Sequence, residues 1–501
     1  MEPLFEIDLD LGPKGSRESG RSLYLQLRAA IADGRLRAGT QLPPTRKAGT
    51  YFGVSRNTAV EAYDRLLSEG YLVARHGSGT YVADPIPLQP APSSALTDPA
   101  AKHRLNGFWL RADIVDAMGF WRDPPPRARV AAPAHSIDFR PALIDARLFP
   151  IEEFRRIIAA QLRGLERRPP QYVSPQGNQG TFRLRDAITQ HIALTRAVVA
   201  GPDDVVVTSG AQQAFDLLAR ILVTSGETVV AVEDPGYPPL RVAFAASGAT
   251  IVPVPVDAEG LVVDQLPTNA GVICVTPSHQ FPLGVTMSAP RRAALIAWAR
   301  AHDAVIVEDD YDGEFRYEGN PLQALRSAEA ADVVFYVGTF SKCMLPSLRL
   351  GFVVAPAWAM PTVVAAKNAL DWHCSMPVQL GVAGFIAGGH LAQHVRKMRR
   401  RYRERREVLL GLLGEQLGPW LEVVPSSYGM HVASLARTAV DLEAIADQLA
   451  GQGVHLHTVR RYYLGPPGRA GFILGYGAAD VAELRRGIAA LRAAFEGTPG
   501  R

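Results

Sequence analysis

The stretch Val333-Val334-Phe335-Tyr336-Val337-Gly338-Thr339-Phe340-Ser341-Lys342 joins an apolar run to a small polar loop that ends in a lysine. A run of β-branched and aromatic residues that stops at a glycine is typical of a buried β-strand. A lysine amine forms a Schiff base with an aldehyde when its surroundings lower its pKa. A lone lysine is nearly always a solvated charge, so the interpretation depends on which residues accompany Lys342.

Four similar apolar runs precede this one, with segments of helix length or more between them. The runs cover residues 205–207, 228–231, 271–274 and 305–307. Short strands that alternate with helices predict βα repetition with a largely parallel, buried sheet, and therefore an α/β fold class. Ligands of such sheets bind beyond the carboxyl ends of the strands, so the residues after each run are candidate site residues.

Two of the strand ends carry motifs that suit a flat, phosphorylated ligand. Thr208-Ser209-Gly210-Ala211-Gln212-Gln213 leads into a helix predicted over Ala214 to Leu222. Backbone N–H groups at a helix N-terminus bind anions such as phosphate, although turns of this kind are also common without a ligand. In Glu233-Asp234-Pro235-Gly236-Tyr237-Pro238 the tyrosine would stack on a flat ring, or pack as an ordinary core or rim residue.

A third motif, Val307-Glu308-Asp309-Asp310-Tyr311-Asp312, ends another run with several acids. A carboxylate here would pair with a protonated pyridine nitrogen, and the tyrosine would hydrogen-bond a phenolic oxygen. Asp309 and the adjacent Asp310 are the alternatives for the first role. An acidic loop or a divalent metal site is the other interpretation, but no histidine spacing supports a metal, and none is predicted.

In this order the motifs resemble the aminotransferase fold, fold type I of the pyridoxal phosphate enzymes, over residues 138–495. The resemblance implies a mostly parallel α/β domain with a smaller C-terminal α+β subdomain, and pyridoxal 5'-phosphate as cofactor. Lys342 would form the Schiff base, Asp309 would pair with the pyridine nitrogen, Tyr311 would bond the phenolic oxygen and Tyr237 would stack on the ring. The phosphate would be held by Ala211, Gln212, Thr339, Arg349 and, from the second subunit of a dimer, Tyr172.

The chain departs from the aminotransferase pattern at the asparagine that usually bonds the phenolic oxygen. The family carries Asn-Pro-x-Gly after one of these strands, whereas the segment here reads Ser278-His279-Gln280-Phe281-Pro282-Leu283-Gly284. Phe281 stands at the asparagine position, so His279 or Gln280 is the candidate substitute.

A second departure concerns the arginine that usually binds the substrate carboxylate on a late strand. Phe472 occupies that position in Gly471-Phe472-Ile473-Leu474-Gly475. Arg460 and Arg461 in the preceding loop are the alternatives, and we predict Arg461 as the residue that binds an effector.

Residues 13–83 form a separate zone with a different pattern. Hydrophobic spacing and capping residues predict a helix over 22–33, a short helix with Thr45 as N-cap, and a longer helix with Ser55 as N-cap. Two alternating segments around a glycine-rich turn then predict a hairpin over 71–83. This order of elements predicts a winged helix-turn-helix.

The start of the longer helix carries Arg56, Asn57 and Thr58, where the second helix of the motif reads the DNA major groove. Arginine suits guanine edges and asparagine suits adenine. Each arginine alone is more often a solvated surface residue. The ordered set, however, resembles the winged-helix domain of the GntR family of bacterial repressors. The DNA contacts of that family fall on Arg46, Arg56, Asn57, His76 and Gly77.

Between the two zones, residues 84–137 are rich in proline and predict an extended, semi-rigid linker. An apolar patch from Phe108 to Trp121 interrupts it and suggests a docking helix. A winged helix joined by a long linker to an aminotransferase-like domain resembles the MocR subfamily of GntR regulators over nearly the whole chain.

The resemblance implies a pyridoxal phosphate-dependent transcriptional regulator rather than an enzyme. The expected partners are operator DNA, a small amine or amino-acid effector that reacts at Lys342, and a second copy in a homodimer, with domain swapping as one arrangement. The alternatives are that the cofactor itself is the signal, or that the chain is an active aminotransferase with a fused DNA-binding domain.

The charge distribution agrees with a local DNA-binding zone. The 501 residues carry a net charge of only +4, but residues 13–83 hold eleven basic and five acidic side chains. An average over the whole chain hides this basic module. Three cysteines without CxxC spacing, no apolar stretch of membrane-spanning length and no signal peptide lead us to expect a cytoplasmic protein with reduced thiols.

Two further features have plain structural interpretations. The segment 396–406 contains eight basic residues and one acid, and reads as the solvated face of a helix rather than as a second DNA surface. Cys343, next to Lys342, is a packed thiol in preference to a redox sensor.

Overall fold

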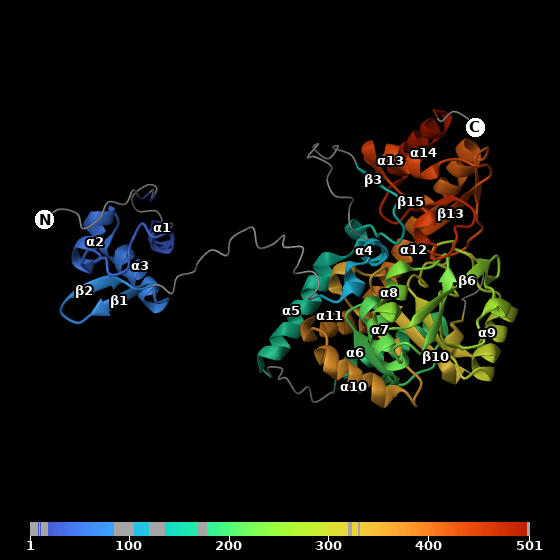
Figure 1. The fold of residues 1–501 in the computed structure, drawn as a ribbon, viewed down its shortest axis with the longest axis horizontal. Coiled ribbons are helices and arrows are strands. Elements are labelled where there is room, and N and C mark those ends of the chain that lie inside the picture. The colour runs from blue at the N-terminus through green and yellow to red at the C-terminus, as the bar shows by residue number, and fades with distance from the viewer. Residues whose placement is uncertain are drawn as a thin grey trace. The chain divides into compact units, whose positions relative to one another are not determined.

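The computed structural model describes residues 9, 11, 19–84, 105–119, 136–167, 178–318, 323–328 and 331–497. The chain divides into two compact units, Met1–Asn106 and Gly107–Arg501. Figure 1 shows the helices and hairpin of the first unit in blue, and the second unit from cyan to red. None of the helices in these ranges combines the length and the apolar character needed to cross a membrane.

The first unit is a winged helix-turn-helix, as predicted. Its elements are α1 (Ser19–Ala32), α2 (Thr45–Phe52), α3 (Arg56–Ser68) and an antiparallel hairpin of β1 (Leu72–Arg75) and β2 (Gly79–Val82). Leu23, Leu27 and Leu66 are fully buried in its core. Gly49 allows α2 to cross close to α3, because a Cβ there would lie 3.1 Å from the backbone of Arg56. This close crossing sets the position of the start of α3 against α2.

The two predicted helix caps have different outcomes. Ser55 is the N-cap of α3, and its Oγ accepts a hydrogen bond from the backbone N–H of Thr58 at 3.1 Å. The prediction for Thr45 is wrong. Pro44, with φ −55° and ψ 145°, occupies the N-cap position of α2 without a side-chain bond, and Thr45 is already helical. The ring of proline fixes the φ that the cap position needs, so the helix starts one residue earlier than its hydroxyl suggests.

The second unit contains an eight-stranded sheet in the order β4-β11-β10-β9-β8-β5-β6-β7. The bounds are β4 (Val205–Thr208), β5 (Val229–Asp234), β6 (Thr250–Asp257), β7 (Gly260–Leu261), β8 (Ala270–Val275), β9 (Val305–Asp310), β10 (Val334–Thr339) and β11 (Gly351–Val354). The four pairings among β6, β5, β8, β9 and β10 are parallel. Only β11, with both neighbours, and β7 pair antiparallel. The largely parallel sheet is confirmed.

Helices cover both faces of this sheet, because successive side chains of a strand point to opposite sides. On one face Val206, Val307 and Val353 pack with α7 (Ala211–Leu222), α8 (Pro238–Ala246) and α10 (Met360–Asp371). The other face packs against α5 (Ile151–Arg167), α6 (Phe182–Arg196) and α11 (Met376–Ala387), and against α9 (Ala289–Ala301). The sheet is thereby buried and its strand ends are left to form a site.

A smaller antiparallel sheet follows in the chain, in the order β12 (Leu421–Val423), β13 (His431–Ala436), β16 (Gly471–Gly475) and β15 (His457–Thr458). Its helices are α12 (His390–Leu412), α13 (Leu442–Gly451) and α14 (Val481–Glu496), seen in orange and red in Figure 1. Near the start of the unit, β3 (Ile137–Asp138) pairs with β14 (Val454–His455). This is the predicted α+β subdomain.

The apolar patch within residues 84–137 contains η3 (Gly107–Leu110) and α4 (Ala112–Met118). Ile114 and Ala117 of α4 pack against Val242 of α8. A docking helix is therefore present in the segment. Much of the segment lies outside the described residues, so the limits of the linker, like the limits of the two domains, stay a prediction.

Candidate functional site

A cavity of about 630 Å³ lies at the carboxyl ends of the large sheet's strands. Eight of the nine residues predicted from the sequence to bind the cofactor line it: Ala211, Gln212, Tyr237, Asp309, Tyr311, Thr339, Lys342 and Arg349. Seven of them lie at or just after the ends of β4, β5, β9 and β10, and Arg349 lies just before the antiparallel β11, so the topology brings all eight to one edge. Tyr172, the ninth, lies outside the described residues.

Lys342 lies just beyond β10, and its Nζ donates a hydrogen bond to the carbonyl of Ala142 at 2.7 Å. Burial lowers the pKa of Lys342 to about 8, although Asp312 and Asp309 favour its charged form. A lysine with this pKa is neutral, and nucleophilic, in a useful fraction of molecules near neutral pH. Its surroundings therefore suit a lysine that attacks an aldehyde.

The four acids of the third motif have four different environments. Glu308 accepts backbone hydrogen bonds from Leu325 and Arg326 at 2.9 and 3.0 Å and anchors a loop. Asp310 forms a buried ion pair with Arg196, with Nε and Oδ2 2.6 Å apart. Asp309 lines the cavity, and Asp312 bonds a histidine. Of the two aspartates left open by the sequence, Asp309 is the one at the cavity.

The carboxylate of Asp309 has room for a partner from the cavity. Within the described part of the chain, its buried Oδ1 has no hydrogen-bond partner. Burial raises the pKa of Asp309 well above its usual value, helped by the charges of Asp310 and Asp312. A protonated ring nitrogen would supply both the missing donor and a compensating charge. This orphaned oxygen fits a pyridine-type cofactor.

The opposite end of the cavity suits an anion. Gly210, with φ +80°, precedes α7, whose first backbone N–H groups have no partner within the helix. The helix starts at Ala211, three residues before the predicted start, because Gly210 provides the turn into it. Nη2 of Arg349 donates to the carbonyl of Ser209 at 3.0 Å, so the guanidinium lies beside this helix end. A Cβ on Gly210 would come within 2.8 Å of that nitrogen. A helix N-terminus with an arginine is a suitable cradle for phosphate.

A buried network that the sequence pattern does not predict supports this cradle. Oε1 of Gln213 accepts a hydrogen bond from the backbone N–H of Ser209 at 2.7 Å and another from Nζ of Lys367 at 3.0 Å. Lys367 is fully buried and also pairs with Asp371. The only available sequence signal is the Gln212-Gln213 pair at the helix start, because Lys367 comes from α10.

An aromatic wall closes one side of the cavity. Tyr237, at the start of α8, meets Phe281 edge-on with ring centroids 5.5 Å apart, and both line the cavity. Gln280 does not line it, since its Nε2 donates to the carbonyls of Pro235 and Phe281, both at 2.8 Å. His279 does not line it either. Neither candidate substitute for the missing asparagine is therefore at the cavity wall.

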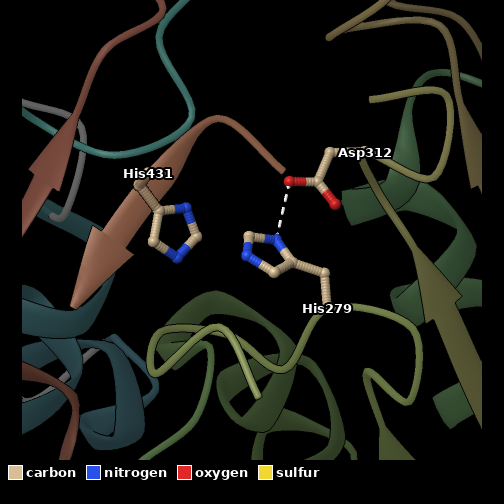
Figure 2. Close-up of side chains that lie close together, drawn as sticks. All are labelled: His279, Asp312 and His431. Atoms are coloured by element: carbon tan, nitrogen blue, oxygen red, sulfur yellow. Dashed lines mark hydrogen bonds and ion pairs between the residues drawn. The ribbon is translucent and has the colours of Figure 1, made fainter. Parts of the chain in front are cut away.

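His279 instead belongs to a buried cluster behind Tyr311, shown in Figure 2. Its Nδ1 lies 2.9 Å from Oδ2 of Asp312 and 2.8 Å from the hydroxyl of Tyr311. The ring of His431, from β13 of the small sheet, lies against it with centroids 4.7 Å apart. Asp312 appears in the third motif, but no sequence signal pairs it with His279, and none points to His431.

The remaining predicted residues of the second unit lie elsewhere. Arg460 and Arg461 are exposed on η12 (Val459–Tyr462) and do not line the cavity, so the role given to Arg461 stays a prediction. Phe472 is fully buried on β16. Cys343 is buried too, and burial raises the pKa of its thiol, as expected for a packed residue.

The basic segment 396–406 lies within α12, but it is not simply a solvated face. Arg405 forms a buried ion pair with Asp145 at 2.7 Å. Arg399 and Arg403 donate to the carbonyls of Glu314 and Tyr317. Much of this charge therefore joins the helix to the rest of the unit, because arginine satisfies several carbonyl groups at once.

In the first unit, the predicted DNA contacts lie on the motif elements. Arg56, Asn57 and Thr58 form the first turn of α3, with Arg56 and Asn57 exposed. Arg46 is exposed in the first turn of α2, and His76 and Gly77 are exposed at the tip of the hairpin, where Gly77 has φ +73°. These side chains are free to meet a ligand on the surface.

Two family patterns match the chain. The pattern of bacterial regulatory proteins of the gntR family matches residues 20–82, and that of class I and II aminotransferases matches residues 153–488. Among solved structures, a Pyrococcus horikoshii kynurenine aminotransferase in complex with PMP superposes with a TM-score of 0.66 and 26% identity. The match covers 72% of this chain and 91% of that one.

Relatives align over nearly the full length. The probable rhizopine catabolism regulatory protein MocR of Rhizobium meliloti is 36% identical over 95% of this chain and 93% of its own. The pyridoxine biosynthesis transcriptional regulator PdxR of Corynebacterium glutamicum is 31% identical over 96% and 97%. Because both matches run through the winged helix and the aminotransferase-like domain together, the chain belongs to the MocR subfamily of GntR-type transcriptional regulators.

Proposed function

We propose that this regulator holds pyridoxal 5'-phosphate in the cavity of its second unit and senses a small amine or amino acid there. One observation carries the proposal. A reactive lysine, a buried carboxylate with an unpartnered oxygen, and a helix N-terminus with an arginine converge on one cavity of about 630 Å³. Cavities of roughly 300–1,000 Å³ hold cofactor-sized ligands.

The residues present suit each part of the cofactor. Arg349 and the first turn of α7 would bind the phosphate, Asp309 the ring nitrogen, and Tyr237 the ring face. The cofactor supplies an aldehyde that reacts with amines. Lys342 would occupy that aldehyde in the absence of effector, and an amine effector would compete with it. Release of Lys342 changes a contact at the cavity wall, because its Nζ is then free to bond Ala142.

One wall of the cavity belongs to the segment of chain that leads from the DNA-binding unit to the large domain. Met118, the last residue of α4, lines the cavity, and Pro239 at the start of α8 lines it as well. Since α4 packs on α8 and precedes the large domain in the chain, a ligand that shifts Met118 alters the anchoring of the interdomain segment. The effector acts only if it binds the two arrangements with different affinity.

The winged helix implies DNA binding. We propose that Arg56, Asn57 and Thr58 contact bases. We propose that Arg46, His76 and Gly77 contact the DNA backbone or the edge of a DNA groove. We further propose a homodimer, in which Tyr172 of each copy completes the phosphate site of the other. Two winged helices then meet two half-sites, and a change in their spacing alters operator affinity.

The second candidate is a working aminotransferase with a fused DNA-binding domain. Lys342, Asp309 and Tyr311 would serve it equally. Phe281 and Phe472 argue against efficient turnover, because a phenyl ring offers neither the amide donor nor the guanidinium of the usual enzyme. The chain is primarily a regulator, and we propose at most residual transamination.

The test compares Lys342→Ala with Lys397→Ala, an exposed lysine on α12. Both proteins are incubated with pyridoxal phosphate and titrated with candidate amines while visible absorbance and binding to DNA upstream of the gene are recorded. We expect Lys342→Ala to lose the visible band and the amine response, and Lys397→Ala to keep both. Retention of both by Lys342→Ala contradicts the proposal.

Two further readouts separate the alternatives. If pyridoxal phosphate alone, without any amine, changes DNA binding, then the cofactor is the signal. Steady release of an oxo acid in the presence of a second amino acceptor indicates an enzyme.

A further inference from the structure

We propose that Asp312 and His279 form a buried relay that fixes the direction of the Tyr311 hydroxyl hydrogen, so that Tyr311 donates it into the cavity. The inference rests on the proposed cofactor site and deepens it. It assigns positioning roles to two residues that do not line the cavity.

The relay follows from the hydrogen count at one nitrogen. Nδ1 of His279 has two neighbours, Oδ2 of Asp312 at 2.9 Å and the hydroxyl oxygen of Tyr311 at 2.8 Å. A ring nitrogen carries either one hydrogen or one lone pair. A lone pair there would face the carboxylate of Asp312 in a buried site, which is repulsive. Nδ1 therefore carries a hydrogen, which it donates to Asp312.

That assignment determines what Tyr311 does with its own hydrogen. An Nδ1 that carries a hydrogen is no acceptor, so the tyrosine hydroxyl has no reason to point its hydrogen at His279. Tyr311 lines the cavity, and burial raises its pKa well above the usual value, so the hydroxyl stays protonated. The hydrogen is left for an acceptor in the cavity, such as the phenolic oxygen of the cofactor.

The ring of His279 is held so that it cannot turn away. A Cβ on Gly429 would lie 1.9 Å from Cε1 of His279, so the backbone of Gly429 packs directly on the ring. The ring of His431 covers it from β13, and Nε2 of His431 donates to the carbonyl of Pro282 at 3.0 Å. Figure 2 shows the two rings and the bond to Asp312. Because the ring cannot turn, Asp312 keeps the hydrogen on Nδ1 of His279 next to the hydroxyl of Tyr311.

The relay compensates for a hydrogen-bond donor that this chain lacks at the cavity. Phe281 lines the cavity where an asparagine amide is usual, and a phenyl ring cannot donate a hydrogen bond. Tyr311 then has to donate reliably by itself. A second orientation of its hydroxyl would leave the acceptor in the cavity unpaired, and a buried unpaired acceptor is costly.

Three buried side chains here, His279, Asp312 and His431, are of the kinds that bind metal ions, with ligand atoms within 4.8 Å of one another. The hydrogen bonds favour the relay. Asp312 bonds Nδ1, whereas the nitrogen of His279 without a partner among the described residues is Nε2, on the other side of the ring. A metal ion on Nε2 would not reach Asp312 without rearrangement.

The experiment is a double-mutant cycle on the full-length protein loaded with pyridoxal phosphate. A donor at the phenolic oxygen withdraws negative charge from it, which lowers the pKa of the bound chromophore. Tyr311→Phe should raise that pKa by about one, a tenfold change in the proton equilibrium. Asp312→Asn should raise it in the same direction, because without the carboxylate charge Nδ1 can carry a lone pair, which then accepts the tyrosine hydrogen.

The cycle distinguishes a relay from a merely structural effect. In the Tyr311→Phe background, Asp312→Asn should add nothing. With Tyr311 present, Asp312→Glu keeps the carboxylate and should keep the chromophore pKa near that of the wild type. Asp145→Asn, which removes a buried carboxylate from the ion pair with Arg405, should leave the chromophore pKa unchanged. The other charged groups at the cavity, Asp309, Lys342 and Arg349, are the same in every variant.

Either of two results overturns the relay: Asp312→Asn titrates like wild type, or its shift persists when Tyr311 is absent. If Asp312→Asn does not fold, ¹⁵N-histidine NMR of the wild-type protein decides, since the relay requires a hydrogen on Nδ1 of His279. If the wild type develops no visible band with pyridoxal phosphate, the proposed cofactor site has failed. The NMR measurement still tests the relay in that case.

Discussion

The winged helix and the cavity hold their functional residues in opposite ways. On α3, Arg56 and Asn57 are exposed neighbours on one helical turn, and the Ser55 cap is adjacent to them. Around the cavity, Asp309 and Lys342 come from the ends of different strands, and partners from α6 and β13 hold the adjacent Asp310 and His279. The first region displays its chemistry on a small stable support, whereas the second builds its chemistry into the core.

This difference predicts how the two regions respond to change. An exposed reading residue can be removed at a cost to DNA binding alone, since nothing in the core depends on it. A residue of the cavity network supports a buried charge, so its loss costs stability as well as function. Variants from the two regions test this contrast, and the largest effect on stability is expected in the buried network.

Arg196→Met should have the largest effect on stability. The variant leaves Asp310 buried without its cation, and among the described residues the hydroxyl of Tyr336, at 2.6 Å, remains as a hydrogen-bond donor to it. Loss of one partner of a buried pair costs about 3–5 kcal/mol. The control is Arg35→Met in the first unit, whose ion pair with Asp33 is exposed and screened by solvent, so its loss should change stability little. Chemical denaturation measures both, and equal losses would contradict the contrast.

The next largest effect is expected in the pH dependence of the reaction of Lys342 with pyridoxal phosphate. Only the neutral amine attacks an aldehyde, so the rate of pyridoxal phosphate capture by apoprotein rises with pH and levels off at the pKa of the lysine. Burial lowers this pKa from 10.5 to about 8. At pH 7 the neutral fraction is then about 300-fold that of an ordinary lysine. Stopped-flow absorbance between pH 6 and 10 should show a plateau above pH 8, and a rate that climbs steadily to pH 10 would exclude the lowered pKa.

The same contrast explains what the sequence could predict. Residues that follow an apolar run, such as Asp309, Tyr311 and Lys342, were predictable because strand ends of a parallel sheet converge on one edge. The choice between Asp309 and Asp310 was not, since it depends on Arg196 from a distant helix.

His431 was unpredictable for the same reason, because it reaches His279 only through the docking of the small sheet. The N-cap of α2 was also difficult to predict from the sequence. Thr45 has a hydroxyl suited to an N-cap, but the backbone of Pro44 takes that position. Local pattern therefore predicted which strand ends form the site, and tertiary packing determined which side chain each end presents.

Arg56→Ala tests the exposed side of the comparison. An arginine that reads a base edge contributes about 1–3 kcal/mol, so we expect operator affinity to fall roughly 5- to 150-fold. The free energy of unfolding should change by less than about 0.5 kcal/mol, because the side chain is exposed. Fluorescence anisotropy with operator DNA, with Arg35→Met as control, measures the first quantity. A stability loss comparable to that of Arg196→Met would show that α3 is not an independent reading surface.

The smallest effect is expected from a pair of cap variants, Ser55→Ala and Thr45→Ala. The hydroxyl of Ser55 satisfies the N–H of Thr58, and loss of such a cap costs about 1 kcal/mol. Thr45 has no capping bond to lose, so its replacement should cost less than about 0.5 kcal/mol. Hydrogen exchange of the full-length protein, read in peptides from α2 and α3, resolves both effects locally. Ser55→Ala should speed exchange in the first turn of α3, whereas Thr45→Ala should leave α2 unchanged. Faster exchange in α2 would mean that Thr45, and not Pro44, sets the start of that helix in solution.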